Sequence, residues 1–337
     1  MAKAPRPFPD GRAFADALGA WGRAVRDRVV PPDPLRDDDP RVLLDDAFLH
    51  QIERLRLNAP RAATSGRSGE HPSRRKAHSI EFADHRAYVP GDDMRSIDWN
   101  VYARLGELCL KLTEARESVD LHLLVDCSPS MDWGRPNKLL YARRVAAALG
   151  ALTLSGGDAV HLGLFARDLY AVSPPLRGRT ALGALLERLS DPLPAATTDV
   201  TGGTNLEASL TAYRGRGHHH GVAVLITDFL TPESHGDALN ILTRTGLSVA
   251  ALHLVDAEEE HPRLDGPIEL LDSETGATTT LRATPTLLRA YEREHARWAL
   301  EIEGACQARR AAYVRVSTHV PPRTLVLDTL RGAGVLV

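Results

Sequence analysis

From residue 119 onward, short apolar runs alternate with longer amphipathic or apolar stretches. The runs, rich in Val, Ile and Leu, predict strands at 119–125, 159–165, 169–172, 221–227, 247–255 and 312–316. The stretches between them predict helices over 137–155, 180–189, about 233–244 and 286–303. A hairpin is expected over 268–281, where Thr275-Gly276 supplies the turn. Strands that alternate with helices in this way are typical of a doubly wound α/β fold, whose mostly parallel sheet is flanked by helices.

The pattern before residue 119 is different. Asp39-Pro40 is a typical helix start, and apolar residues then recur at helical spacing up to Leu55. We therefore expect four parts, in chain order: a flexible Pro-rich arm (1–38), a helix plus a charged and aromatic segment (39–118), the α/β domain (119–320) and a C-terminal tail (321–337).

Candidate chemistry lies where two predicted strands end. Asp126 follows the first strand of the α/β domain and Asp228 follows the strand at 221–227, so both carboxylates should border the crevice where strand order reverses. Ser128, Ser130 and Thr204 add hydroxyls on nearby loops. Such oxygen ligands suit Mg²⁺ first, with Mn²⁺ or Ca²⁺ as alternatives, rather than Zn²⁺ or Cu²⁺.

Two other interpretations of these residues stay open. Asp and Ser also favour helix caps and turns, so the loop could be purely structural. A metal-dependent hydrolase acting on a phosphorylated or acyl substrate is the second, although Ser128 stands where an aspartyl-phosphate enzyme would carry its second carboxylate. Lys138, on the next predicted helix, is the cation that could reach the site. Elsewhere, the run of three glutamates from Glu258 to Glu260 predicts a solvated turn.

Composition narrows the range of partners. The 337 residues include 41 Lys and Arg against 44 Asp and Glu, a net charge of −3, which does not favour binding to nucleic acid. Three scattered cysteines indicate a reducing compartment, and no apolar run reaches the roughly 20 residues of a membrane span. With neither a signal peptide nor a Walker lysine loop, the sequence predicts a cytoplasmic chain that does not itself hydrolyse ATP.

Two sets of motifs resemble known families. DCSPSM (126–131), GGTNL (202–206) and TDF (227–229) together resemble the metal-ion-dependent adhesion site of von Willebrand factor A domains. The segment 79–104 resembles a bacterial family catalogued as domain of unknown function 58 (DUF58), which is associated with MoxR-type AAA+ ATPases. The resemblance implies a Rossmann-like von Willebrand factor A fold with an N-terminal extension packed on it.

The resemblance also implies a function. We expect a non-catalytic, Mg²⁺-dependent protein-binding module that serves a MoxR-type AAA+ ATPase as an adaptor in protein assembly or maturation. An Asp or Glu of a protein ligand would complete the ion's coordination. The metal-dependent hydrolase remains the alternative.

The segment 79–104 supplies the candidate partner-binding residues. They combine charge with an aromatic ring: Glu81, Arg86, Asp92, Asp93, Arg95, Asp98, Trp99 and Arg104. Arg, Tyr and Trp are enriched at protein interfaces, which favours a docking surface. The same residues could equally form a structural cover whose carboxylates satisfy its arginines. A second acidic metal site on Asp92 and Asp93 is a third option.

Overall fold

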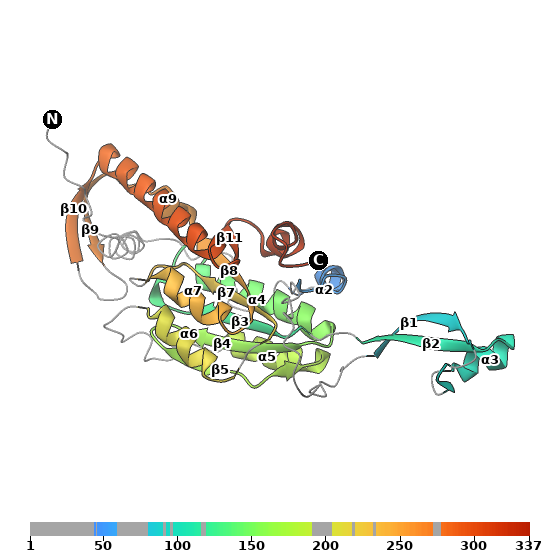
Figure 1. The fold of residues 1–337 in the computed structure, drawn as a ribbon. Helices are drawn as coiled ribbons and strands as arrows, with labels where there is room; N and C mark the ends of the chain where they lie inside the picture. Colours follow the sequence, from blue (N-terminus) through green and yellow to red (C-terminus); the bar gives the residue numbers. More distant parts are fainter. Residues whose placement is uncertain are drawn as a thin grey trace. The chain divides into compact units, whose positions relative to one another are not determined.

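A computed structural model describes most of the chain, and the chain divides into two compact units (Figure 1). The described residues are 44, 46–58, 80–89, 92–94, 97–115, 119–190, 204–217, 220–231, 234–271 and 278–337. Residues 63–118 form the smaller unit, and the remainder belongs to the larger one. The expected arm (1–38) and the Asp39-Pro40 helix start lie outside the described residues.

The larger unit is built on a mostly parallel sheet of seven strands. In chain order these are β3 (Leu121–Asp126), β4 (Ala159–Phe165), β5 (Leu169–Val172), β6 (Leu176–Arg177), β7 (Val222–Thr227), β8 (Ser248–Val255) and β11 (Ala312–Ser317). They lie side by side in the order β11-β8-β7-β3-β4-β5, and β6 also pairs with β4. β5 and β6 run antiparallel to β4, and the other neighbours are parallel. The α/β architecture expected from the sequence is confirmed.

Helices cover both faces of this sheet (Figure 1). The main ones are α4 (Lys138–Ser155), α5 (Leu182–Ser190), α6 (Leu206–Arg214), α7 (His235–Thr243) and α9 (Pro285–Gln307). Successive strand residues point to opposite faces. Leu123 and Val125 of β3 therefore join the core that contains α4 and α5, whereas Leu124 joins the core that contains α6, α7 and α9. The central strands are buried on both faces, which explains their uninterrupted apolar sequences.

Both ends of the described chain pack against the larger unit. Phe48 and Ile52 of α2 (Asp46–Ile52) are buried, and the backbones of Arg56 and Val337 exchange two hydrogen bonds of 2.9 Å. The segment expected as a C-terminal tail forms α10 (Pro322–Thr324), a π-helical turn (Leu325–Thr329) and α11 (Leu330–Gly332). Its apolar side chains enter the same core as α4. Residues 46–58 therefore belong to the larger unit with the α/β domain. The sequence pattern had placed them with the charged segment.

The smaller unit contains a β-hairpin that the sequence pattern did not predict. β1 (Ile80–Ala87) pairs antiparallel with β2 (Cys109–Ala115), and α3 (Trp99–Leu105) lies between them in sequence. The Asp98 carboxylate caps α3 by accepting the backbone N–H groups of Asn100 and Val101.

A second hairpin, β9 (Gly266–Leu271) with β10 (Thr278–Ala283), confirms the expected one and belongs to the larger unit. The short helix α8 (Ala257–Glu260) connects β8 to this hairpin. Within the described ranges, every helix is too short or too polar to cross a lipid bilayer.

Candidate functional site

The sheet topology brings the two predicted carboxylates to one edge. Asp126 is the last residue of β3, and Asp228 directly follows β7. These strands are parallel neighbours, so their carboxyl ends meet. The chain leaves β3 for β4 on one side and later returns to β7 on the other, which makes this the point where strand order reverses. Ligands of open α/β sheets bind at such points.

The loop after β3 holds the first carboxylate and two hydroxyls in fixed positions. The buried Asp126 carboxylate accepts the Ser128 backbone N–H (2.9 Å) and the Thr227 hydroxyl (2.5 Å). The hydroxyls of Ser128 and Ser130 are hydrogen-bonded to each other, with their Oγ atoms 2.9 Å apart, and both side chains are buried. Two adjacent ligands of an octahedral Mg²⁺ ion, each about 2.1 Å from it, would lie about 3.0 Å apart. The two hydroxyls are therefore spaced as adjacent ligands of a small divalent cation would be, and such an ion would replace the hydrogen bond between them.

The second carboxylate has a cationic partner. Asp228 Oδ1 accepts the Leu230 backbone N–H (3.1 Å), and Oδ2 accepts the Lys138 ammonium (2.8 Å). The same ammonium donates to Glu259 Oε1 at 2.5 Å, and the Lys138 side chain has no exposed surface. Glu259 is held in turn by the Asp256 N–H, which donates to its other oxygen (3.0 Å). Glu259 is thus buried, and the solvated turn expected for this stretch is wrong at this residue.

Burial shapes the charges in this site. Burial, followed by the Asp228 charge, raises the pKa of Asp126 to about 7. Burial also raises the pKa of Glu259 to about 7, although Lys138 opposes the shift. Burial alone would lower the pKa of Lys138, but attraction to Asp228 and Glu259 outweighs it and raises that pKa. Three carboxylates and one ammonium carry a net charge of −2 when all are ionised, which one divalent cation would balance.

The remaining predicted ligand is Thr204. It is buried directly before α6, whose N-cap is Asn205. Across the described part of the chain, no three His, Cys, Asp or Glu side chains are grouped so that they could hold a metal ion. An ion bound here would need hydroxyl and water ligands in addition to the carboxylates.

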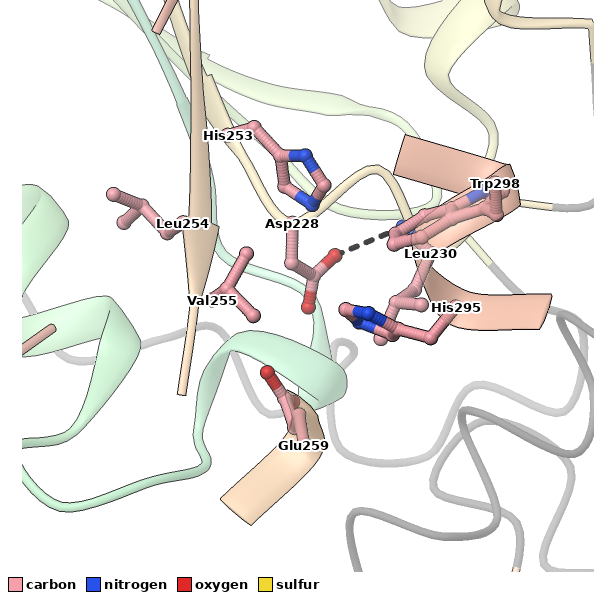
Figure 2. A pocket seen from close by; sticks show the side chains of 8 residues that line it. All are labelled: Asp228, Leu230, His253, Leu254, Val255, Glu259, His295 and Trp298. Carbon is pink, nitrogen blue, oxygen red and sulfur yellow. Dashed lines mark hydrogen bonds between the residues drawn. The ribbon is translucent and has the colours of Figure 1, made fainter. Parts of the chain in front are cut away.

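A small hollow adjoins Asp228 on the side of the sheet that faces α9 (Figure 2). It is lined by Asp228, Leu230, His253, Leu254, Val255, Glu259, His295 and Trp298. Burial lowers the pKa of His253 well below its usual value. Burial, with the nearby Arg315 charge, lowers that of His295 to about 3. Both imidazoles are therefore neutral at pH 7. They come from β8 and α9, and no local motif marks them in the sequence.

The candidate partner-binding residues of the smaller unit have mixed roles. Arg86 and Asp92 form an ion pair of 2.8 Å, and Asp92 also accepts the Val89 N–H (2.9 Å). The hydrogen bond from Arg86 lowers the pKa of Asp92. The Arg86–Asp92 pair matches the cover interpretation, in which carboxylates satisfy arginines, whereas Asp98 caps α3 instead. A second metal ion on Asp92 and Asp93 would compete with the Arg86 guanidinium for Asp92.

The other candidate partner-binding residues are either exposed or outside the described part of the chain. Asp93, Trp99 and Arg104 are exposed. Arg95 and the side chain of Glu81 lie outside the described structure.

Exposed apolar side chains concentrate in the same unit. Six of the eight large hydrophobic side chains that are exposed among the described residues lie there, namely Val89, Met94, Trp99, Tyr102, Leu105 and Leu108. We refer to these six as the apolar surface. Trp99 is 58% exposed and meets Tyr102 edge-to-face, with ring centroids 6.1 Å apart. Exposed apolar side chains of this kind often belong to an interaction site.

Comparisons with known proteins agree with the resemblance to DUF58. The family described as "Protein of unknown function DUF58" matches residues 84–301. The uncharacterized proteins Mb1516 of Mycobacterium bovis and Rv1480 of Mycobacterium tuberculosis are each 28% identical to this chain, over 79% of it and 82% of their own length.

Two solved structures are more distantly similar. One is the conserved hypothetical protein BatB from Bacteroides thetaiotaomicron, with 16% identity and a TM-score of 0.39. The other is an aerotolerance-related membrane protein from Bacteroides fragilis carrying multiple mutations to serine, with 17% identity and a TM-score of 0.39. Each match covers 64% of this chain and 98% of the other.

The Lys138 contacts predict a large effect on stability. Lys138→Met leaves Asp228 and Glu259 buried without their common counter-ion. The free energy of unfolding, measured with urea at pH 7 without divalent ions, should therefore fall by about 3–5 kcal/mol. Arg297→Met removes a cation from the exposed pairs with Glu294 and Glu301 on α9, and should cost at most about 1 kcal/mol. Equal urea midpoints for the two variants would contradict the inferred role of Lys138.

The lowered pKa of His295 predicts how stability depends on pH. The folded protein keeps His295 neutral, whereas the same imidazole in the unfolded chain binds a proton near pH 6.5. The contribution of neutral His295 to the free energy of unfolding is therefore complete above pH 6.5 and is lost as the pH falls toward 3. When the pH falls from 8 to 5, the free energy of unfolding of wild type should therefore drop by about 2 kcal/mol more than that of His295→Gln. Urea unfolding at both pH values measures the difference.

Proposed function

The chain belongs to the DUF58 family, whose description names no activity, and we propose that it is a non-catalytic protein-binding module that works through a divalent cation. Mg²⁺ is the proposed ion, with Mn²⁺ and Ca²⁺ as alternatives. Asp126, Ser128, Ser130, Thr204 and Asp228 are its proposed ligands. The observation that carries this proposal is the pair of buried hydroxyls of Ser128 and Ser130, held 2.9 Å apart at the carboxyl end of β3.

The proposed ligand set leaves an ion one position for a further ligand. Both oxygens of Asp126 and both oxygens of Asp228 already accept hydrogen bonds. Each of these oxygens keeps a second lone pair, so the carboxylates would bind the ion together with the three hydroxyls of the proposed ligand set. Mg²⁺ requires six oxygen ligands and often retains several waters. One of those waters can give way to an Asp or Glu of a protein partner.

A second contact would give the complex its orientation, and the apolar surface of the smaller unit is its proposed location. Aromatic residues and Met are enriched at protein interfaces, and Trp99, Tyr102 and Met94 provide both. Following the resemblance noted in the sequence, we propose a MoxR-type AAA+ ATPase as the partner and the cytoplasm as the location. The adaptor would serve the assembly or maturation of other proteins.

The side chains around the site give little support to the hydrolase alternative. Burial raises the pKa of the Cys127 thiol to about 12, so it is not a thiolate nucleophile at neutral pH. The Lys138 ammonium already donates to two carboxylates rather than being directed toward an empty phosphate site.

Calorimetric titration with Mg²⁺ tests the cation site. The wild-type protein should bind one ion, and Ser130→Ala should bind it about tenfold more weakly because a direct ligand is lost. Ser209→Ala is the matched control, since Ser209 is also a buried serine, on α6, and does not belong to the proposed ligand set. Absence of Mg²⁺ binding, or equal binding by both variants, would refute the assignment. Hydrolysis of a phosphate or acyl ester that Ser130→Ala abolishes would instead favour the hydrolase.

Binding to the purified MoxR-type ATPase of the same cell tests the second contact. Trp99→Ser should weaken binding at least tenfold, both in Mg²⁺ and in EDTA, because an exposed aromatic anchor is lost. Leu300→Ser, an equally exposed apolar residue on α9, should not change it. If Trp99→Ser and Leu300→Ser bind alike, the apolar surface is not the interface. Since Trp99 is exposed, loss of folding is not expected to obscure the result.

A further inference from the structure

Lys138 occupies a particular place beside the proposed cation site. It is the first residue of α4, so it follows the serine loop closely in sequence, and its ammonium reaches Asp228 Oδ2 after β7. Its other acceptor, Glu259, comes from α8 after β8. β8 is the neighbour of β7 in the sheet, so one buried ammonium connects loops that follow three successive strands.

This arrangement places a fixed positive charge where a divalent ion would be bound. Positive charges repel strongly when both are shielded from water, and an ammonium that donates to a carboxylate oxygen competes for its lone pairs. An ion that engages Asp228 through Oδ2 must therefore share that oxygen with Lys138 or displace the ammonium from it. An ion that engages Oδ1, which accepts the Leu230 N–H, is still repelled by the nearby ammonium. The cost of losing a buried charge-assisted hydrogen bond is large unless a second acceptor is present.

Glu259 is that second acceptor. Its Oε1 lies 2.5 Å from the Lys138 ammonium, while its other oxygen is held by the Asp256 N–H. The ammonium can consequently release Asp228 and remain paired inside the protein. Neither Lys138 nor Glu259 belongs to the proposed ligand set, yet both control the charge that the ligands experience.

We propose that Lys138 is a built-in cation that competes with the divalent ion for Asp228, and that Glu259 holds the ammonium when the ion binds. The inference rests on the proposed function and adds regulation to it. The site alternates between an ammonium-bound and an ion-bound state. The ion binds more weakly than its oxygen ligands alone would allow, so an acidic group from a partner adds to the stability of the ion-bound state.

Two variants separate competition by Lys138 from a simple effect of net charge. Glu259→Gln removes one negative charge but retains an amide oxygen for the Asp256 N–H. It leaves Lys138 with Asp228 as its charged acceptor, so Mg²⁺ should bind about tenfold more weakly. The double variant Lys138→Met/Glu259→Gln has the same formal charge as wild type but lacks the ammonium. It should bind Mg²⁺ about tenfold or more tightly than wild type.

A matched control tests whether any lost carboxylate would act in the same way. Asp120→Asn also removes one negative charge, but Asp120 lies just before β3, about 20 Å from Asp126 along the strand. Its Mg²⁺ affinity should equal that of wild type. Calorimetry with Mg²⁺ alone gives the affinities. The rise in melting temperature on adding Mg²⁺, which should be larger for the double variant than for wild type, provides a second measurement that also shows that each variant folds.

The outcomes distinguish this inference from the proposed function. Tighter binding by the double variant and weaker binding by Glu259→Gln would support it. Wild type that binds Mg²⁺ with the same affinity as the double variant would overturn the inference while leaving the cation site intact. Binding by the double variant but not by wild type would support competition by Lys138 and refute a cation-dependent role for the wild-type protein. No binding by any variant would refute both.

Discussion

The larger unit depends on balancing charge that is buried at the carboxyl end of its sheet. Asp126, Asp228 and Glu259 are each at most 7% exposed, and unpaired carboxylates at such depth would cost several kcal/mol each. The Lys138 ammonium compensates two of them directly, and hydrogen bonds from backbone and hydroxyl groups hold Asp126. The network therefore serves stability before it serves any ligand, because the helices that cover the sheet could not pack over uncompensated charge.

The topology explains why this charge gathers in one place. β3, β7 and β8 are parallel neighbours, so the loops that follow them emerge at one edge. α4 begins at this edge and brings Lys138 with it, since Asn137 caps the helix by accepting the Leu140 N–H. α8 begins there as well, with Asp256 and Glu259 forming a reciprocal capping box. Ordinary helix capping thus positions both the ammonium and its second acceptor.

Much of the larger unit could be predicted from its sequence, because its strands and helices carry their own periodic signal. The all-apolar strand β3 and the apolar helix α4 are clear examples, and Asp126 and Asp228 could be placed because they follow such strands directly. Contacts between distant parts of the chain could not be predicted in this way. Nothing local separates Glu259 from its neighbours Glu258 and Glu260, since only the approach of Lys138 makes it a buried partner. The β1–β2 hairpin was missed because its first strand is largely polar and its pairing partner lies more than 20 residues away.

The two contacts proposed for this chain differ in physical character. The proposed contact through the ion would be conditional, because it would require both the cation and an acidic group, and the Lys138 ammonium bound to Asp228 would oppose it. A contact through the apolar surface needs neither, since burial of exposed hydrophobic side chains is favourable at any cation concentration. When two such contacts engage one partner, the first raises the effective concentration for the second. A partner already held by the apolar surface could therefore coordinate even a weakly bound ion. Because Lys138 would lower the affinity of the free site, the ion would bind stably only when that partner is present.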